Sequence, residues 1–112
     1  MALNDAFLTD AGEWTPTDPG VKRRILVHRE EMMMVEVAFE PDAVGAPHSH
    51  PHIQSSYVAE GSFEVTIDGK TQTLEKGGSF IVAPDLVHGV KALTAGRLID
   101  VFTPMRQDFV GA

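Results

Sequence analysis

Four of the five histidines in this chain occur at two places in the sequence. His48, His50 and His52 lie within residues 47–53, and His88 follows far downstream. Imidazole is the commonest protein metal ligand, and it binds metals in its neutral form. Side chains two residues apart point the same way in an extended segment, so His48 and His50 can face one centre. A short histidine-rich tract with a distant partner is typical of a metal site, whereas the alternative is a solvated turn between prolines.

Gln54 follows the histidine-rich stretch directly and can add an oxygen ligand. Three neutral imidazoles and a neutral amide would leave a divalent ion its full charge, so the site should attract an anion and polarise a bound oxygen strongly. The amide is a weaker ligand than a carboxylate, so the metal should exchange more readily. Mixed nitrogen and oxygen ligands suit nickel, zinc, iron, manganese or copper. We assign no ligand role to His52, and we interpret His28, beside a charged pair, as a surface histidine.

A single acidic residue, Asp100, interrupts an otherwise apolar strand near the end of the chain. Ile99 and Val101 face one way in an extended strand, so Asp100 and Phe102 share the other face. A buried carboxylate is costly unless it is paired or used, which favours a functional Asp100 facing the interior. The alternatives are an exposed aspartate on an edge strand and a buried ion pair.

Arg106 lies beyond this strand, after a Thr-Pro step. Its planar guanidinium presents a fork of N–H groups that suits a carboxylate ligand. A salt bridge to one of the many acidic side chains of the chain is the alternative.

The elements that must position these side chains are short strands. Apolar and polar residues alternate with a period of two, turn residues such as the Asp68-Gly69 pair separate the runs, and no segment shows helical periodicity over three turns. The expected strands cover residues 21–27, 32–39, 54–60, 63–67, 70–74, 80–83, 90–93 and 97–102. This spacing predicts an all-β sandwich or barrel.

The length of 112 residues predicts a single domain. We expect residues 1–20 to form an irregular N-terminal arm, with Trp14 as a packing anchor rather than a ligand contact, and residues 21–112 to form the barrel. The net charge of −7 argues against nucleic acid and anionic membranes as partners, although a local metal or arginine could still bind a small anion.

The chain has no cysteine, which excludes disulfides, thiolate nucleophiles and iron–sulfur clusters. No apolar run is long enough to span a bilayer, and the first twenty residues lack the pattern of a signal peptide. We therefore expect a cytoplasmic location.

Two separate motifs in this order resemble those of the cupin superfamily. The first comprises Gly45, His48, His50, Gln54 and Gly61, and the second comprises Gly78, Pro84 and His88. The resemblance implies a double-stranded β-helix, the cupin jelly-roll barrel. Two departures matter: the usual glutamate ligand is Gln54 here, and the asparagine often found after the second-motif histidine is absent, with Ala92 nearest to its place.

A closer likeness, over nearly the whole chain, is to the KdgF family of small pectin-degradation cupins. It rests on residues 98–109, residues 21–26, the histidine-rich stretch with its glutamine, and the approach to residues 88–90. The resemblance implies opening of the ring of 4,5-unsaturated uronates, from pectin or alginate lyase action, to the linear keto form. It implies the metal ligands His48, His50, Gln54 and His88 and the catalytic residues Asp100, Phe102 and Arg106.

Two other functions stay open at this point. One is a different metal-dependent cupin enzyme, an isomerase or a dioxygenase, and the other is a non-catalytic sugar-binding cupin. Small cupins commonly pair, and a short jelly roll leaves sheet edges and an apolar face that need cover. We therefore predict a homodimer to which the N-terminal arm and the region around Trp14 contribute.

Overall fold

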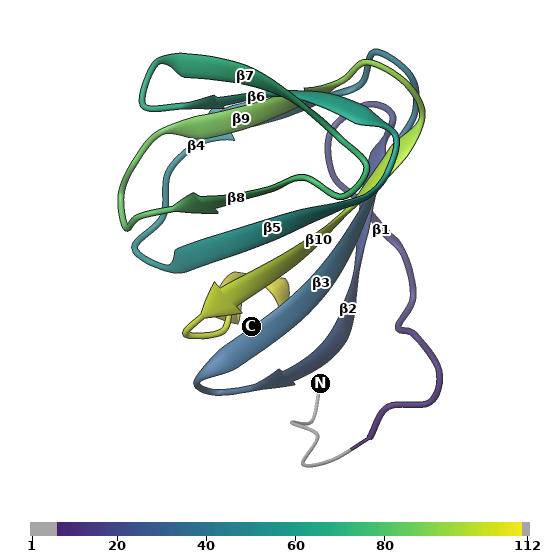
Figure 1. Cartoon of the computed structure of the whole chain (residues 1–112). Helices are drawn as coiled ribbons and strands as arrows, with labels where there is room; N and C mark the ends of the chain where they lie inside the picture. Colours follow the sequence, from purple (N-terminus) through teal and green to yellow (C-terminus); the bar gives the residue numbers. More distant parts are fainter. Residues whose placement is uncertain (1–6, 111–112) are drawn as a thin grey trace.

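The computed structural model describes residues 7–110 as two antiparallel β-sheets that face each other (Figure 1). The six-stranded sheet has the order β1-β2-β3-β10-β5-β8, and the four-stranded sheet has the order β4-β9-β6-β7. The strands are β1 (Thr15–Pro16), β2 (Val21–Arg29), β3 (Met32–Phe39), β4 (Val44–His48), β5 (Ile53–Glu60), β6 (Ser62–Ile67), β7 (Lys70–Glu75), β8 (Ser79–Val82), β9 (His88–Ala92) and β10 (Gly96–Thr103). The only helical element in this part of the chain is a 3₁₀ turn, η1 (Gln107–Phe109), so the all-β prediction is confirmed.

Most predicted strands occur where the alternation placed them, with ends that differ by one or two residues. A further strand, β4, lies in a segment where we expected none. It contains a glycine and a proline, which are poor strand residues, and it becomes a strand because it pairs with β9, with Val44 opposite Lys91 and His48 opposite His88. Gly89 permits this close approach, because a Cβ there would lie 3.2 Å from the backbone of Pro47.

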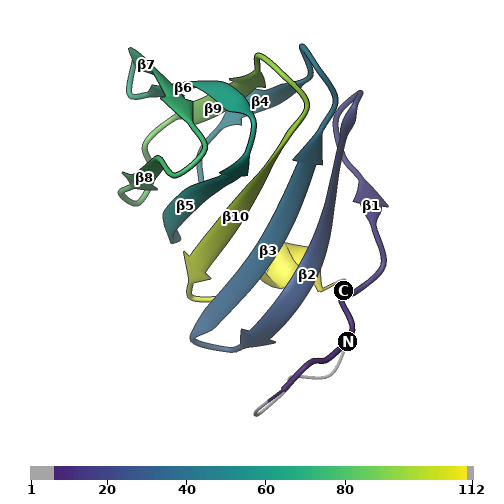
Figure 2. The same ribbon diagram turned by 45° about the vertical axis from the view of Figure 1, so that its right-hand side comes forward.

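The predicted irregular arm contains one short strand. Thr15 and Pro16 form β1 and pair with Arg23 and Lys22 of β2, so that part of the prediction is wrong. The ring of Trp14 lies 4.6 Å from the Lys22 ammonium and 4.3 Å from the Arg24 guanidinium carbon, which packs the arm against its own chain. Figure 2 shows β1 running beside β2. Residues 1–6 of the arm lie outside the described residues, and the domain boundary at residue 20 stays a prediction.

Two apolar clusters fill the space between the sheets. Leu98 belongs to the larger cluster, with Val58 and Phe63, and Phe102 belongs to the second. Alternate residues of β10 are buried, so Asp100 lies between the two clusters on the inward face. The barrel interior is therefore apolar on either side of a polar zone centred on this strand.

Two charged or polar groups depart from the simple alternation. The register between β2 and β3 shifts between Ile25 and Val27, and beyond this bulge His28 faces the interior at 3% exposure, so the prediction of a surface histidine is wrong. Glu36 is also 3% exposed and receives hydrogen bonds from Arg24 and Arg97. Burial alone would raise the pKa of Glu36, but these two guanidinium groups hold that pKa below its usual value.

Within residues 7–110, no helix combines the length and the apolar character that crossing a membrane would require.

Candidate metal centre

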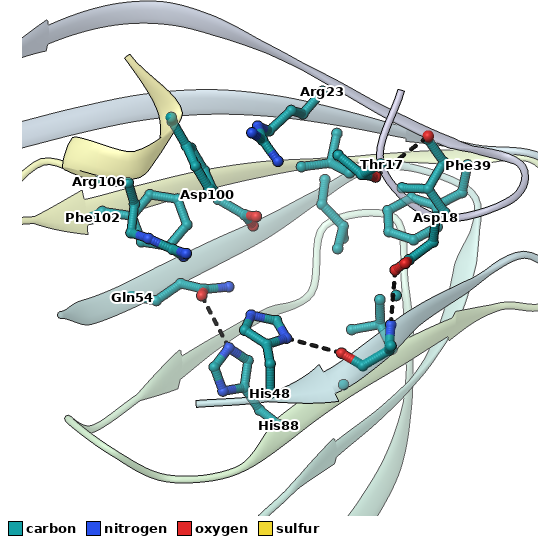
Figure 3. A pocket seen from close by; sticks show the side chains of 18 of the residues that line it. Thr17, Asp18, Arg23, Phe39, His48, Gln54, His88, Asp100, Phe102 and Arg106 are labelled. Carbon is teal, nitrogen blue, oxygen red and sulfur yellow. Dashed lines mark hydrogen bonds between the residues drawn. The ribbon is translucent and has the colours of Figure 1, made fainter. Parts of the chain in front are cut away.

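A pocket of about 290 Å³ opens on the polar zone between the two sheets (Figure 3). Its wall combines residues of both sheets, the arm and the C-terminal segment, among them Asp18, Arg23, His48, Gln54, His88, Asp100, Phe102 and Arg106. Asp18 accepts a hydrogen bond from the backbone N–H of Ala46, at 3.1 Å, and so holds the arm against β4 at the pocket wall. The volume is near the lower end of the range for ligand sites, which suits a small molecule.

Three histidines converge at one end of this pocket. The candidate ligand atoms of His48, His50 and His88 all lie within 4.8 Å of one another. The pairing of β4 with β9 places His48 directly opposite His88, with ring centroids 4.4 Å apart. His50 comes from the loop between β4 and β5, and its ring centroid lies 4.8 Å from that of His88. The structure therefore brings together the three histidines that the sequence predicted as metal ligands.

Each of these imidazoles is oriented by its Nδ1 atom. The Nδ1 atoms of His48, His50 and His88 lie within hydrogen-bonding distance of the backbone carbonyl oxygens of Ala46 (2.9 Å), His52 (3.2 Å) and Leu86 (2.9 Å), respectively. A carbonyl oxygen can only accept, so Nδ1 carries the proton of the neutral ring and Nε2 presents a lone pair. Burial lowers the pKa of His50 and His88, which favours the neutral form that binds metals.

Gln54 presents its amide oxygen to the same point. Its Oε1 lies 3.0 Å from Nε2 of His50 and 3.1 Å from Nε2 of His88, and its Nε2 donates to the Ser56 hydroxyl at 3.0 Å. The bond to Ser56 fixes which end of the amide faces the histidines. With the Nδ1 tautomers, imidazole and amide lone pairs point at one another, and a cation between them would satisfy all of them. The donor set therefore fits a divalent transition metal.

Asp100 lies beside this donor set and is 8% exposed. Ser56 lies directly opposite it on β5 and donates a hydrogen bond to its Oδ1 at 2.6 Å. Burial raises the pKa of Asp100 to about 6, although the Ser56 hydrogen bond and the charge of Arg106 both act to lower it. Because this pKa lies above the usual 3.8, the ionised carboxylate lowers the stability of the fold above about pH 6, and that cost is relieved as the pH falls through 6.

The C-terminal segment closes the pocket with a cation and two aromatic rings. Arg106 forms a two-point ion pair with Asp108, with Nε 3.1 Å from Oδ1 and Nη2 2.9 Å from Oδ2. Its guanidinium carbon lies 4.3 Å from the ring centre of Phe109 and 5.2 Å from that of Phe102. The Phe102 ring is 2% exposed and stands edge-on to the His50 imidazole. The salt bridge that the sequence offered as the alternative role of Arg106 is therefore present, and its partner is Asp108 in the pocket wall.

Two residues of the site, one beside the pocket and one in its wall, were missed by the sequence reasoning. Ser56 joins Asp100 to Gln54, and its position two residues after Gln54 on a strand was an available signal. Arg23 faces the pocket from β2, where it lies on the same face as the buried Val21 and Ile25. His52 is not part of the three-histidine group; its ring lies 6.4 Å from that of Phe102.

Known proteins share this architecture. The family model described as "Cupin domain" matches residues 35–102. The "Pectin degradation protein KdgF" of Dickeya dadantii (strain 3937) is 42% identical over 106 residues, which cover 93% of this chain and 96% of that protein. The solved structure of KdgF from Halomonas sp. superposes with a TM-score of 0.83 at 38% identity, covering 87% of this chain and 90% of that one. An RmlC-like cupin from Shewanella frigidimarina NCIMB 400 superposes with a TM-score of 0.90 at 40% identity, covering 97% and 99%.

Two facing sheets around a three-histidine site, together with these matches, show that the chain belongs to the cupin family. Within that family it belongs to the KdgF group, which it matches over nearly its whole length. The double-stranded β-helix predicted from the two motifs is thereby confirmed.

We predict that the neutral amide of Gln54 keeps the metal exchangeable. Gln54→Glu should lower the Kd of a divalent metal by about tenfold or more, because a carboxylate at this distance adds direct charge attraction. His88→Ala should abolish stoichiometric binding, and His52→Ala serves as the control that retains it. Metal content after dialysis against graded chelator measures all three, and a Glu variant that loses its metal as readily as the unmodified protein would contradict the prediction.

Proposed function

We propose that this protein opens the ring of 4,5-unsaturated uronates to the linear keto form. The observation that carries the proposal is one continuous set of contacts, in which Asp100 connects through Ser56 and Gln54 to the converging histidines. A base beside a metal centre suits proton transfer to and from a sugar hydroxyl. The relative from Dickeya dadantii is named for pectin degradation, and pectin is a polymer of acidic sugars.

The ligands in this proposal are His48, His50, Gln54 and His88, which would hold a divalent transition metal. Nickel, zinc, iron, manganese and copper all suit nitrogen ligands with one oxygen. When bound, the ion would act as a Lewis acid toward the oxygens of the sugar.

Asp100 is the proposed general base. It takes the proton of the anomeric hydroxyl; the bond between C1 and the ring oxygen then breaks as the C1 carbonyl forms. The ring oxygen leaves with the electron pair and recovers a proton from Asp100 to give an enol, which tautomerises to the ketone. A positioned base of this kind contributes about 10²–10⁴-fold. With a pKa of about 6, Asp100 is mostly ionised at neutral pH and still returns its proton readily.

Phe102 and Arg106 complete the proposed catalytic set. Phe102 is nearly inaccessible, so its role is to shape the wall against which the sugar ring lies. Arg106 faces the pocket and lies close enough to Asp100 to affect its pKa, so it contributes positive charge both to the base and to the carboxylate of a uronate.

The direct test uses the unsaturated monosaccharides released by pectin lyases and by alginate lyases. We expect the metal-loaded protein to speed ring opening, observed by NMR, and chelator to abolish the effect. No oxygen should be consumed. Oxygen uptake would instead support a dioxygenase, and thermal stabilisation by these sugars without turnover would support a sugar-binding cupin. The relative rates with the two substrate pools identify the preferred uronate.

We predict that Asp100→Asn loses about 10²–10⁴-fold in rate while it keeps the fold and the metal, because the amide cannot accept the proton. In the unmodified protein the rate should rise with pH as Asp100 ionises, at or below about pH 6, since only the ionised carboxylate is the base and a bound cation would lower its pKa further. Loss of the ultraviolet absorbance of the unsaturated uronate measures both. A variant that retains full activity would rule out Asp100 as the base.

We also propose that two copies pair through the outer face of the six-stranded sheet. The strand register places Met34, Val101, Ser55 and Ile81 in one row across this face, and Ile81 is 67% exposed. Ile99 and Tyr57 lie opposite each other in the adjacent row. An exposed apolar patch of this kind suits an interface between chains. Trp14 packs on its own chain, so the sheet replaces the arm as the main proposed contact.

For the homodimer we predict twice the mass of one chain by size-exclusion chromatography with light scattering at micromolar concentration. Ile81→Lys should produce monomers, because it places a charge at the most exposed apolar side chain of the patch. Gln72→Lys, on the exposed strand β7 of the other sheet, is the matched control. A monomeric unmodified protein would contradict the proposal. The cytoplasmic location stays a prediction from the sequence.

A further inference from the structure

The pocket contains a second arginine, Arg23, which lies on β2 and contacts the same Phe109 ring as Arg106. Arg23 lies on β2 between Val21 and Ile25, whose side chains are buried, and this alternation turns it toward the interior. Figure 3 shows its guanidinium pointing into the pocket on the side of Asp100. The phenyl ring of Phe109 lies against it, 3.8 Å from the guanidinium carbon to the ring centre, which orients the group.

The two arginines differ in what they bind. Arg106 directs its Nε and Nη2 atoms at the carboxylate of Asp108. Within residues 7–110, no hydrogen bond or ion pair engages the guanidinium of Arg23, on which Asp108 acts only at longer range. Arg23 therefore keeps its full fork of N–H donors available to whatever enters the pocket.

The electrostatic surroundings of Arg23 favour an incoming anion. Burial lowers the pKa of Arg23, Asp108 opposes this, and the like charge of Arg106 lowers the pKa further. A partly desolvated cation next to a second cation gains both solvation and charge compensation when a carboxylate arrives. A neutral ligand in the same place would leave the guanidinium covered and unpaired, which is costly.

We propose that Arg23 is a specificity-determining residue that binds the carboxylate of the substrate together with Arg106. Arg23 supplies a two-point contact from β2, and Arg106 supplies charge from the C-terminal segment, where Asp108 holds it. The pocket thereby selects monosaccharide acids over neutral sugars of the same size. This inference rests on the proposed function for the identity of the substrate, but the selectivity itself is a binding property that can be measured without turnover.

The test compares the binding of D-galacturonate with that of D-galactose. Neither sugar has the reactive double bond, and only galacturonate carries a carboxylate. Calorimetry on the metal-loaded protein should show that the unmodified chain prefers galacturonate by at least about tenfold. Arg23→Gln should weaken galacturonate binding by about 10- to 100-fold, the range for a charge-assisted hydrogen-bonded pair, and leave galactose binding unchanged. Lys22→Gln removes the same charge from the outward face of the same strand and should bind both sugars like the unmodified protein.

The outcomes separate this inference from the proposed function. If Arg23→Gln retains the preference for galacturonate, the inference is wrong whether or not ring opening is observed. If the preference depends on Arg23 but no ring opening occurs, the inference stands and the proposed function fails. Where both hold, Arg23→Gln should raise KM for the unsaturated uronate far more than it lowers kcat, because Arg23 does not contact the reacting atoms.

Folding of the variants is checked by circular dichroism and metal content. Should Arg23→Gln fail to fold, the galacturonate affinity of Arg23→Lys tests the inference instead, because this variant keeps the charge and removes the planar fork. A loss of about tenfold in galacturonate affinity supports the inference, and an unchanged affinity overturns it.

Discussion

The hydrogen-bonded connection from Asp100 through Ser56 to Gln54, whose amide oxygen faces the histidines, is the interaction on which the site depends. It lies where the apolar filling of the barrel is interrupted, so each polar atom there needs a partner. Ser56 donates to the carboxylate and accepts from the amide, and this directs the amide oxygen of Gln54 at the imidazoles. One small hydroxyl therefore orients both the Gln54 amide and the Asp100 carboxylate. The lone pairs that converge at the centre form a donor set that fits a cation.

Two buried carboxylates of this chain show how surroundings decide a role. Glu36 receives hydrogen bonds from two arginines, and its pKa is held below the usual value. It therefore remains ionised and links neighbouring strands of the six-stranded sheet. Asp100 has one neutral donor, Ser56, and a more distant cation, and burial raises its pKa to about 6. Full charge compensation gives a structural ion pair. Partial compensation leaves a carboxyl group whose pKa lies close to neutral pH, so that it can exchange protons.

The electrostatics of the pocket are opposite to those of the whole chain. A net charge of −7 would repel an acidic sugar at long range. Inside the pocket, however, Arg23 and Arg106 provide positive charge at short range, and a metal held by neutral ligands would add to it, so local interactions outweigh the screened global field. Asp108 holds Arg106 at the pocket wall, and Phe109 lies against both guanidinium groups. The pocket is thus organised for a small anion by groups from both ends of the chain.

The sequence by itself determined what depends on local periodicity and residue chemistry: most strands, the histidine pair with its glutamine, and an inward-facing Asp100. The tertiary structure decided what depends on pairing between distant segments. It made a strand of residues 44–48, set His48 opposite His88 and turned His28 inward past a bulge. It also brought Ser56 against Asp100 and placed Arg23 in the wall of the same pocket. Alternation within one strand is a short-range property, which a sequence displays directly. Register and bulges are set by contacts between strands far apart in the chain, and these follow only from how the whole barrel packs.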